Sequence, residues 1–180
     1  MKILAFAASN SRKSINKQLI AYSGNQLNDD DVELLDINDY EMPIYSADLE
    51  AEHGIPDAAK RFLDKIATAD ALLISYAEHN GSYTVAYKNL FDWASRVQRE
   101  VYQGKSIVML ATSPGGSGAA SVLRSAVESA VFFDGHVVGS FSLPKFYENF
   151  DSEKGELVDE ALQQQLVSTL EALHAEKEDK

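Results

Sequence analysis

The stretch KILAFAASNSRKSINKQLI, residues 2–20, decides the fold of this chain. Its apolar run at 2–8 suits a buried strand, a hydroxyl-rich loop follows at 9–14, and Ile15, Leu19 and Ile20 then recur at helical spacing. The apolar run is too short to span a membrane and shorter than the core of a usual secretory signal. We therefore interpret residues 2–20 as the strand, loop and helix of a βα unit.

The same alternation recurs along the remaining sequence. Apolar runs predict further strands at 32–37, 69–76, 105–112 and 136–143, and helical periodicity predicts helices at 57–67, 83–97, 118–133 and from 158 onward. The segment 38–56, which contains Met42-Pro43, is expected to be irregular. Five such units predict an α/β fold with a doubly wound parallel sheet and helices on both faces, since a barrel needs eight. The length of 180 residues and the absence of an internal repeat predict one domain over 1–180.

Composition excludes several classes of protein. With no cysteine, the chain has no disulfide, thiol nucleophile or cysteine-bound metal, and we expect a cytoplasmic protein. Its four histidines do not show helical metal-ligand spacing, so we expect no metal site. The net charge of −12 argues against binding to nucleic acid or to an anionic membrane. Residues 1–28 nevertheless carry four basic side chains and no acid, which favours either a small-anion site or a chance cluster on a solvated face.

Three loops follow the strands whose ends should form the ligand-binding edge of the sheet. The first has three serines, a guanidinium and two amides just where a helix begins, a place that favours phosphate. Its candidate residues are Ser9, Ser11, Arg12, Ser14, Ile15 and Asn16. It lacks both the G-x-G-x-x-G and the P-loop patterns, so a Rossmann dinucleotide site or an NTPase is not expected. The alternative is a capped helix without a ligand.

The second and third loops supply further candidates. The second is Glu78-His79-Asn80-Gly81, where Gly81 allows a close backbone approach to a flat ligand, although these residues are also common turn formers. His79 is more typical of a polar loop residue than of a catalytic histidine. The third contains Ser113, Gly115 and Gly116, and it fits neither the dinucleotide fingerprint nor the nucleophile elbow.

Taken in order, these loops resemble those of the NADPH-dependent FMN reductases, the flavodoxin-like group that includes quinone, azo-dye and chromate reductases. The resemblance covers about residues 1–145 and rests on three segments: 9–16, then 78–82 with Lys88-Asn89-Leu90-Phe91-Asp92-Trp93, then 113–116 with Leu123-Arg124. It implies a flavodoxin-like strand order of 2-1-3-4-5. Ala77 and His79 stand where the family usually has proline and tyrosine beside the flavin ring, which puts the strength of flavin binding in question.

The resemblance implies an FMN-dependent NAD(P)H oxidoreductase without a catalytic side chain, because FMN carries the chemistry. Hydride would pass from the nicotinamide to FMN and on to a quinone, a free flavin or a similar acceptor, in ping-pong order. The first loop would hold the phosphate, residues 78–81 would border the ring, and Ser113, Gly115 and Gly116 would close another side. Two alternatives stay open: a non-enzymatic electron carrier, which the acidic surface favours, and a flavin-free binding protein of the same fold.

One helix face predicts self-association. The stripe comprises Tyr83, Tyr87, Leu90, Phe91, Ala94 and Val97, with Trp93 beside it. Part of it must be ordinary core, but aromatic residues are enriched in interface cores. Because the resemblance also implies a flavin site completed by a neighbouring subunit, we expect a homodimer or homotetramer.

Overall fold

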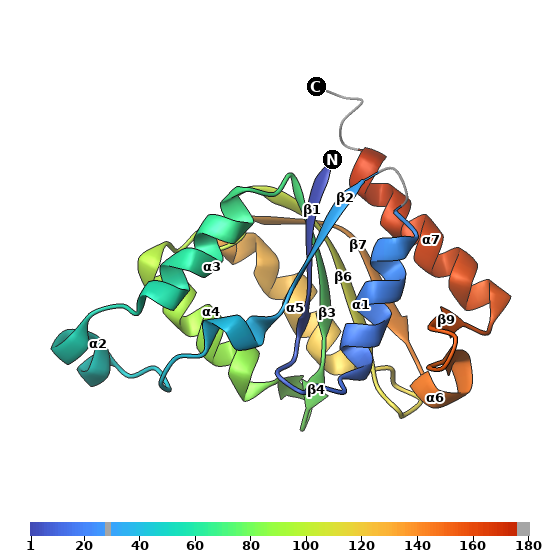
Figure 1. Cartoon of the computed structure of the whole chain (residues 1–180), viewed down its shortest axis with the longest axis horizontal. Coiled ribbons are helices and arrows are strands. Elements are labelled where there is room, and N and C mark those ends of the chain that lie inside the picture. The colour runs from blue at the N-terminus through green and yellow to red at the C-terminus, as the bar shows by residue number, and fades with distance from the viewer. Residues whose placement is uncertain (28–29, 176–180) are drawn as a thin grey trace.

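The fold is built on a parallel sheet that has helices on both of its faces (Figure 1). The computed structural model describes residues 1–27 and 30–175. Within them the five-stranded sheet has the order β2-β1-β3-β6-β7. Its strands are β1 (Lys2–Ala8), β2 (Asp31–Leu35), β3 (Ala71–Tyr76), β6 (Lys105–Thr112) and β7 (Gly135–Leu143). Counted along the sheet strands alone, this is 2-1-3-4-5, so the predicted fold is confirmed.

The central strands are apolar because both of their faces are covered. Every residue of β3 is buried, as are six of the seven in β1. The helices α1 (Ile15–Asn25) and α7 (Glu160–Ala175) cover one face, where Leu19 and Leu166 have no exposed surface. The helices α3 (Asp57–Ala67), α4 (Val85–Val97) and α5 (Ala120–Ala130) cover the other face. The two layers hold the carboxyl ends of β1, β3 and β6 at one edge.

The connection expected to be irregular contains two short helices, so this prediction was wrong in part. They are the 3₁₀ helix η1 (Ile37–Tyr40) and the α-helix α2 (Ala47–His53). Helix α2 projects from the body on an extended arm (Figure 1), and none of its residues is buried. Because α2 packs no apolar face against the core, its sequence shows no helical period. We call residues 41–55 the arm.

Several short elements escaped sequence reasoning. The segment after β3 forms the hairpin of β4 (Glu78–His79) and β5 (Ser82–Tyr83), so the helix expected from residue 83 begins at Val85. The helix expected over 118–133 is α5, followed by the 3₁₀ helix η2 (Val131–Phe133). The helix α6 (Phe146–Asn149) and the hairpin of β8 (Phe150–Asp151) and β9 (Glu156–Leu157) follow β7. Among the described residues, no helix has the length and apolar character that crossing a membrane requires.

Candidate functional site

The three predicted loops meet around one open cavity of about 240 Å³ at the carboxyl edge of the sheet. We call it the strand-end cavity. Its lining contains eight of the predicted site residues: Ser9, Ser11, Ser14, Ile15, Asn16, Glu78, His79 and Ser113. The other five, which are Arg12, Asn80, Gly81, Gly115 and Gly116, lie on the same loops but outside the lining.

The first loop presents hydrogen-bond donors to this cavity. Ser14 is the N-cap of α1, and its side chain accepts from the backbone N–H of Lys17. Ile15 and Asn16 occupy the first two helical positions, where a backbone N–H has no partner within its own helix. Such groups, together with the helix dipole, favour an anion. Lys13, which also lines the cavity, adds a positive charge.

The basic segment is smaller than the sequence suggests. The Lys17 ammonium lies 2.7 Å from Asp36, and Lys2 lies 3.6 Å from Glu33 beside the opposite end of β1. Among the described residues, this leaves Arg12 and Lys13 as the basic side chains of the segment with no ion pair, and both are exposed. The idea of a fourfold basic site is therefore corrected to a pair of adjacent cations at the loop tip.

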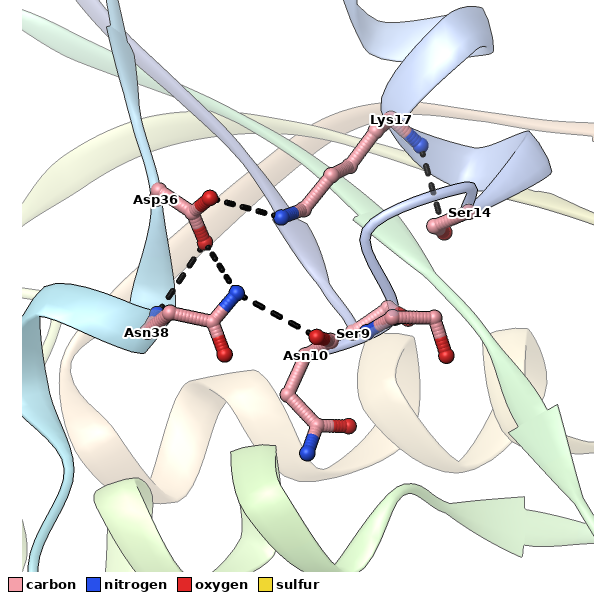
Figure 2. A network of polar contacts seen from close by, with 7 residues as sticks. Ser9, Asn10, Ser14, Lys17, Asp36 and Asn38 are labelled. Carbon is pink, nitrogen blue, oxygen red and sulfur yellow. Dashed lines mark hydrogen bonds and ion pairs between the residues drawn. The ribbon is translucent and has the colours of Figure 1, made fainter.

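Asp36 fastens the first loop to the end of β2, as Figure 2 shows. Besides Lys17, it accepts hydrogen bonds from the backbone N–H and the side-chain amide of Asn38, at 3.0 and 2.9 Å. That amide also donates to the carbonyl of Asn10 at 3.2 Å. Partial burial alone raises the pKa of Asp36, but the hydrogen bonds and charge of Lys17 and the bonds from Asn38 outweigh it and set the pKa below its usual value.

Asn16 is a buried link between α1 and two strands. Its side-chain oxygen accepts from the Ser75 hydroxyl at 2.8 Å and from the Thr112 N–H at 3.1 Å, while its amide donates to the Thr112 carbonyl at 3.2 Å. These three bonds use both side-chain oxygen lone pairs and one of the two amide N–H groups of Asn16, whose backbone N–H also has no partner within α1. The asparagine thereby sets the position of the α1 N-terminus above the sheet.

The second loop is a tight hairpin, and the backbone angles of its turn account for the residues found there. Asn80 and Gly81 both have positive φ, 53° and 77°, which is the requirement of a two-residue type I′ turn. The side-chain carboxylate of Glu78 accepts a hydrogen bond from the backbone N–H of Val122 at 2.9 Å. This N–H belongs to the first turn of α5, whose N-cap Ala119 offers no side-chain acceptor. Glu78 therefore joins the second loop to the third.

The third loop is tied to the segment that follows β7. The carbonyls of Ser113 and Gly115 accept from the N–H groups of Phe146 and Lys145 at 3.1 and 2.9 Å. Gly118 is required where the two segments touch: its φ is +58°, and a Cβ there would lie 2.9 Å from the backbone nitrogen of Pro144. Because the carbonyls face this segment, the loop backbone is fixed beside the cavity.

Five residues that line the cavity were not among the predicted site residues: Lys13, Ala77, Thr112, Pro114 and Tyr147. Tyr147 follows the last sheet strand, whose loop was not considered. Its neighbour Phe146 is fully buried and anchors the turn, whereas Tyr147 is 70% exposed and borders the cavity. An exposed aromatic residue just after a strand end was the signal that could have identified it.

The comparisons with known proteins agree with this geometry. The model of the family of NADPH-dependent FMN reductases matches residues 1–148. The chain belongs to this family. It is therefore an oxidoreductase by family, and FMN and NAD(P)H are the family's cofactors, as the resemblance implied.

Relatives of this FMN reductase family member include proteins from bacteria and plants. It is 33% identical over 144 residues to the NAD(P)H-dependent FMN reductase PA1204 of Pseudomonas aeruginosa, covering 79% of this chain and 76% of the relative. It is also 33% identical over 148 residues to an NADPH:quinone oxidoreductase of Arabidopsis thaliana, covering 80% and 73%. The solved structure of the flavoenzyme NAD(P)H:(acceptor) oxidoreductase FerB of Paracoccus denitrificans superposes with a TM-score of 0.76 at 26% identity, covering 99% and 97%.

Proposed function

We propose that this protein passes hydride from NAD(P)H, through FMN bound in the strand-end cavity, to a quinone, a free flavin or a similar small acceptor in ping-pong order. The observation that carries the proposal is the convergence of all three predicted loops on one cavity, where one end is lined by serines and by helix N–H groups that have no partner within α1. The relatives named as FMN and quinone reductases support the choice of acceptor class.

The residues divide the cavity into two ends. Ser9, Ser11, Ser14 and the backbone of Ile15 and Asn16 fit a phosphate, with Arg12 at the loop tip close enough in sequence to close over it. The other end is formed by Glu78 and His79 on the hairpin whose turn is Asn80-Gly81, and by Ser113 on the loop of Gly115 and Gly116. We assign these residues to the flavin ring.

Bound FMN supplies the hydride acceptor and donor, and the protein binds and orients it. The backbone hydrogen bonds of the third loop and the hydrogen bond between Glu78 and Val122 fix the two sides of the cavity relative to each other before any ligand enters. We assign no protein side chain as a catalytic acid or base. Among the described residues, no group of three or more histidine, aspartate or glutamate side chains is arranged to hold a metal.

The arm supports the proposal of a homodimer or homotetramer. It carries Ile44, 68% exposed, and the helix α2 without a buried residue, yet it is fastened to α4 by the Arg96–Glu50 ion pair at 2.9 Å. The aromatic stripe on α4 is largely core, since Tyr87, Leu90 and Ala94 are buried in the protomer. The self-association surface that we propose is therefore the arm with the exposed edge of α4. A sedimentation run that gave a 20-kDa species at micromolar concentration would refute it.

Two further parts of the proposal concern the whole chain. We place the protein in the cytoplasm, because a cysteine-free chain gives no sign of an oxidising compartment. We also take residues 1–180 as one FMN-binding domain, in keeping with the two helical layers around a shared sheet.

One experiment separates the enzyme from its alternatives. The visible spectrum of the purified protein is recorded, and NADH or NADPH oxidation is then followed at several fixed concentrations of a quinone. A flavin spectrum with turnover, and parallel lines in double-reciprocal plots, support the proposed enzyme. A flavin spectrum without NAD(P)H oxidation indicates an electron carrier, and a protein that neither carries nor binds flavin indicates a binding protein of this fold.

A further inference from the structure

The segment that follows β7 forms part of the wall of the strand-end cavity, but the proposed function gives it no role. This segment brings Tyr147 to the cavity with 70% of its side chain exposed. Single exposed apolar residues are common on protein surfaces, so exposure alone does not indicate a role. What distinguishes Tyr147 is the way its backbone is held, the side of the sheet on which it lies, and its unpaired hydroxyl.

The backbone around Tyr147 is fixed before any ligand binds. The N–H groups of Lys145 and Phe146 donate to carbonyls of the third loop at 2.9 and 3.1 Å. Phe146 and Phe150 are buried, and their rings stack with centroids 4.8 Å apart. The Phe146 ring also meets the Tyr147 ring edge to face, with 5.5 Å between the centroids. Tyr147 can therefore contact a ligand without the entropic cost of ordering a loop.

Tyr147 lies at the end of the cavity that we assign to the phosphate. Helix α6 lies on the same side of the sheet as α1 and α7 (Figure 1), and Phe146 shares an apolar cluster with Leu19 of α1. The hairpin assigned to the flavin ring lies on the other side, where Tyr83 packs against the opposite cluster and Glu78 contacts α5. Tyr147 therefore borders the half of the cavity that contains the N-terminus of α1.

The hydroxyl of Tyr147 is an unused donor in surroundings that suit an anion. Within the described part of the chain it has no hydrogen-bond partner. The charged residues that line the cavity are Lys13 and Glu78, and Glu78 belongs to the ring end. Glu148, the next residue on α6, is paired with Lys145 at 3.0 Å. A phenolic O–H donates one hydrogen bond, and such a bond is stronger when the acceptor oxygen is charged.

We propose that Tyr147 is a specificity-determining residue whose hydroxyl donates a hydrogen bond to the phosphate of FMN and so favours FMN over riboflavin. The inference rests on the proposed function, because it needs FMN in the strand-end cavity. It adds the loop after the last sheet strand to the three loops that the sequence indicates. Together with Lys13, it gives the phosphate end a second polar wall opposite the serines.

The test removes the hydroxyl and keeps the ring. Flavin-free wild-type protein and Tyr147→Phe are titrated separately with FMN and with riboflavin, followed by the quenching of flavin fluorescence. We expect the affinity for FMN to fall about tenfold, the low end for a hydrogen bond to a charged group because the site is exposed. The affinity for riboflavin should change by about twofold or less. The phosphorus NMR signal of bound FMN should shift between the two proteins, whereas the urea midpoint of the flavin-free proteins should not.

Phe132→Ala is the control, because Phe132 is 64% exposed and precedes β7 at the opposite edge of the sheet. It should leave both affinities unchanged. An unchanged FMN affinity or an unchanged phosphorus signal in Tyr147→Phe would overturn the inference and leave the proposed function standing. Equal losses for FMN and riboflavin would also overturn it, and would place Tyr147 against the part that the two flavins share. Wild-type protein that binds no FMN would overturn both the inference and the proposed function.

Discussion

The carboxylate of Glu78 accepts a hydrogen bond from the backbone N–H of Val122 at 2.9 Å, across a sequence separation of 44 residues. It replaces the missing side-chain cap of α5 and places a negative charge at the positive end of the helix dipole. The N-terminus of α5 is thus already in contact with a carboxylate.

Glu78→Ala should lower the free energy of unfolding by about 1 kcal/mol, as loss of a helix cap does. It should also weaken FMN and riboflavin binding by equal factors, because the second loop loses its link to the third. Glu78→Gln keeps an acceptor oxygen and should retain most of the stability and most of the flavin affinity. Urea unfolding and flavin titration measure these effects, with Glu128→Ala on the exposed side of α5 as the control. A Glu78→Ala protein as stable as the control would show that the hydrogen bond between Glu78 and Val122 does not stabilise the fold.

Asn16→Ala should lower the free energy of unfolding by about 2–3 kcal/mol, because the Thr112 N–H and the Ser75 hydroxyl lose their buried acceptor. The control is Asn25→Ala at the exposed end of α1, which should change stability by about 0.5 kcal/mol or less. FMN affinity should fall more than riboflavin affinity, because the helix N-terminus whose position changes is the part of the cavity assigned to the phosphate. Similar stability of the two variants would remove Asn16 from its positioning role.

Three buried tyrosines make the protein sensitive to alkali. The hydroxyl of Tyr102 lies 3.4 Å from that of Tyr76 and 3.1 Å from that of Tyr87. Burial, the largest cause, raises all three pKa values, and the neighbouring hydroxyls raise those of Tyr76 and Tyr87 further. The folded state therefore keeps protons that the unfolded state loses at about pH 10, so this stability is present below pH ~10 and is lost as the pH rises.

Free energies of unfolding measured from pH 8 upward should thus decline above about pH 10, and the part of the tyrosinate absorbance that comes from the three buried tyrosines should appear together with the loss of structure. Tyr87→Phe removes one of the three groups and should make that decline shallower. Ionisation of all tyrosines before any loss of circular dichroism would contradict the burial of this cluster.

Arg12→Ala tests the charge at the tip of the first loop. Hydrogen bonds to charged groups contribute roughly 1.5–3 kcal/mol, so FMN binding should weaken by about 10- to 100-fold. Riboflavin has no phosphate, and its affinity should not change. Apoprotein stability should stay within about 0.5 kcal/mol, and the wild-type preference for FMN should shrink as salt rises. Arg61→Ala, an exposed residue of α3, is the control; equal losses for FMN and riboflavin would point to damaged loop shape instead.

The sheet could be predicted because its strands carry their own signal. The buried parts of β1, β3 and β6 are apolar except for Ser75 and Thr112, and the helices between the strands show a clear apolar face. The elements that escaped prediction are those of two to four residues, such as β4, β5 and α6, and the unburied helix α2, because none has an apolar period to detect.

The sequence predicted which loops form the site, but it did not predict which residues their side chains pair with by ion pairs and hydrogen bonds. The alternation of strands placed 9–16, 78–81 and 113–116 at one edge before any contact was known. The pairing of Lys17 with Asp36, however, joins two segments through the fold, and it removed half of the apparent basic charge together with Lys2–Glu33. The side chain of Asn16 likewise turned inward, toward strands whose distance the sequence does not give.

The central claim is that the strand-end cavity holds FMN by its phosphate. The most direct measurement is a titration of flavin-free protein with FMN and, separately, with riboflavin, followed by the quenching of flavin fluorescence. We predict one FMN per chain, bound at least tenfold more tightly than riboflavin at low salt. Equal affinity for the two flavins, or no binding of either, would contradict the claim.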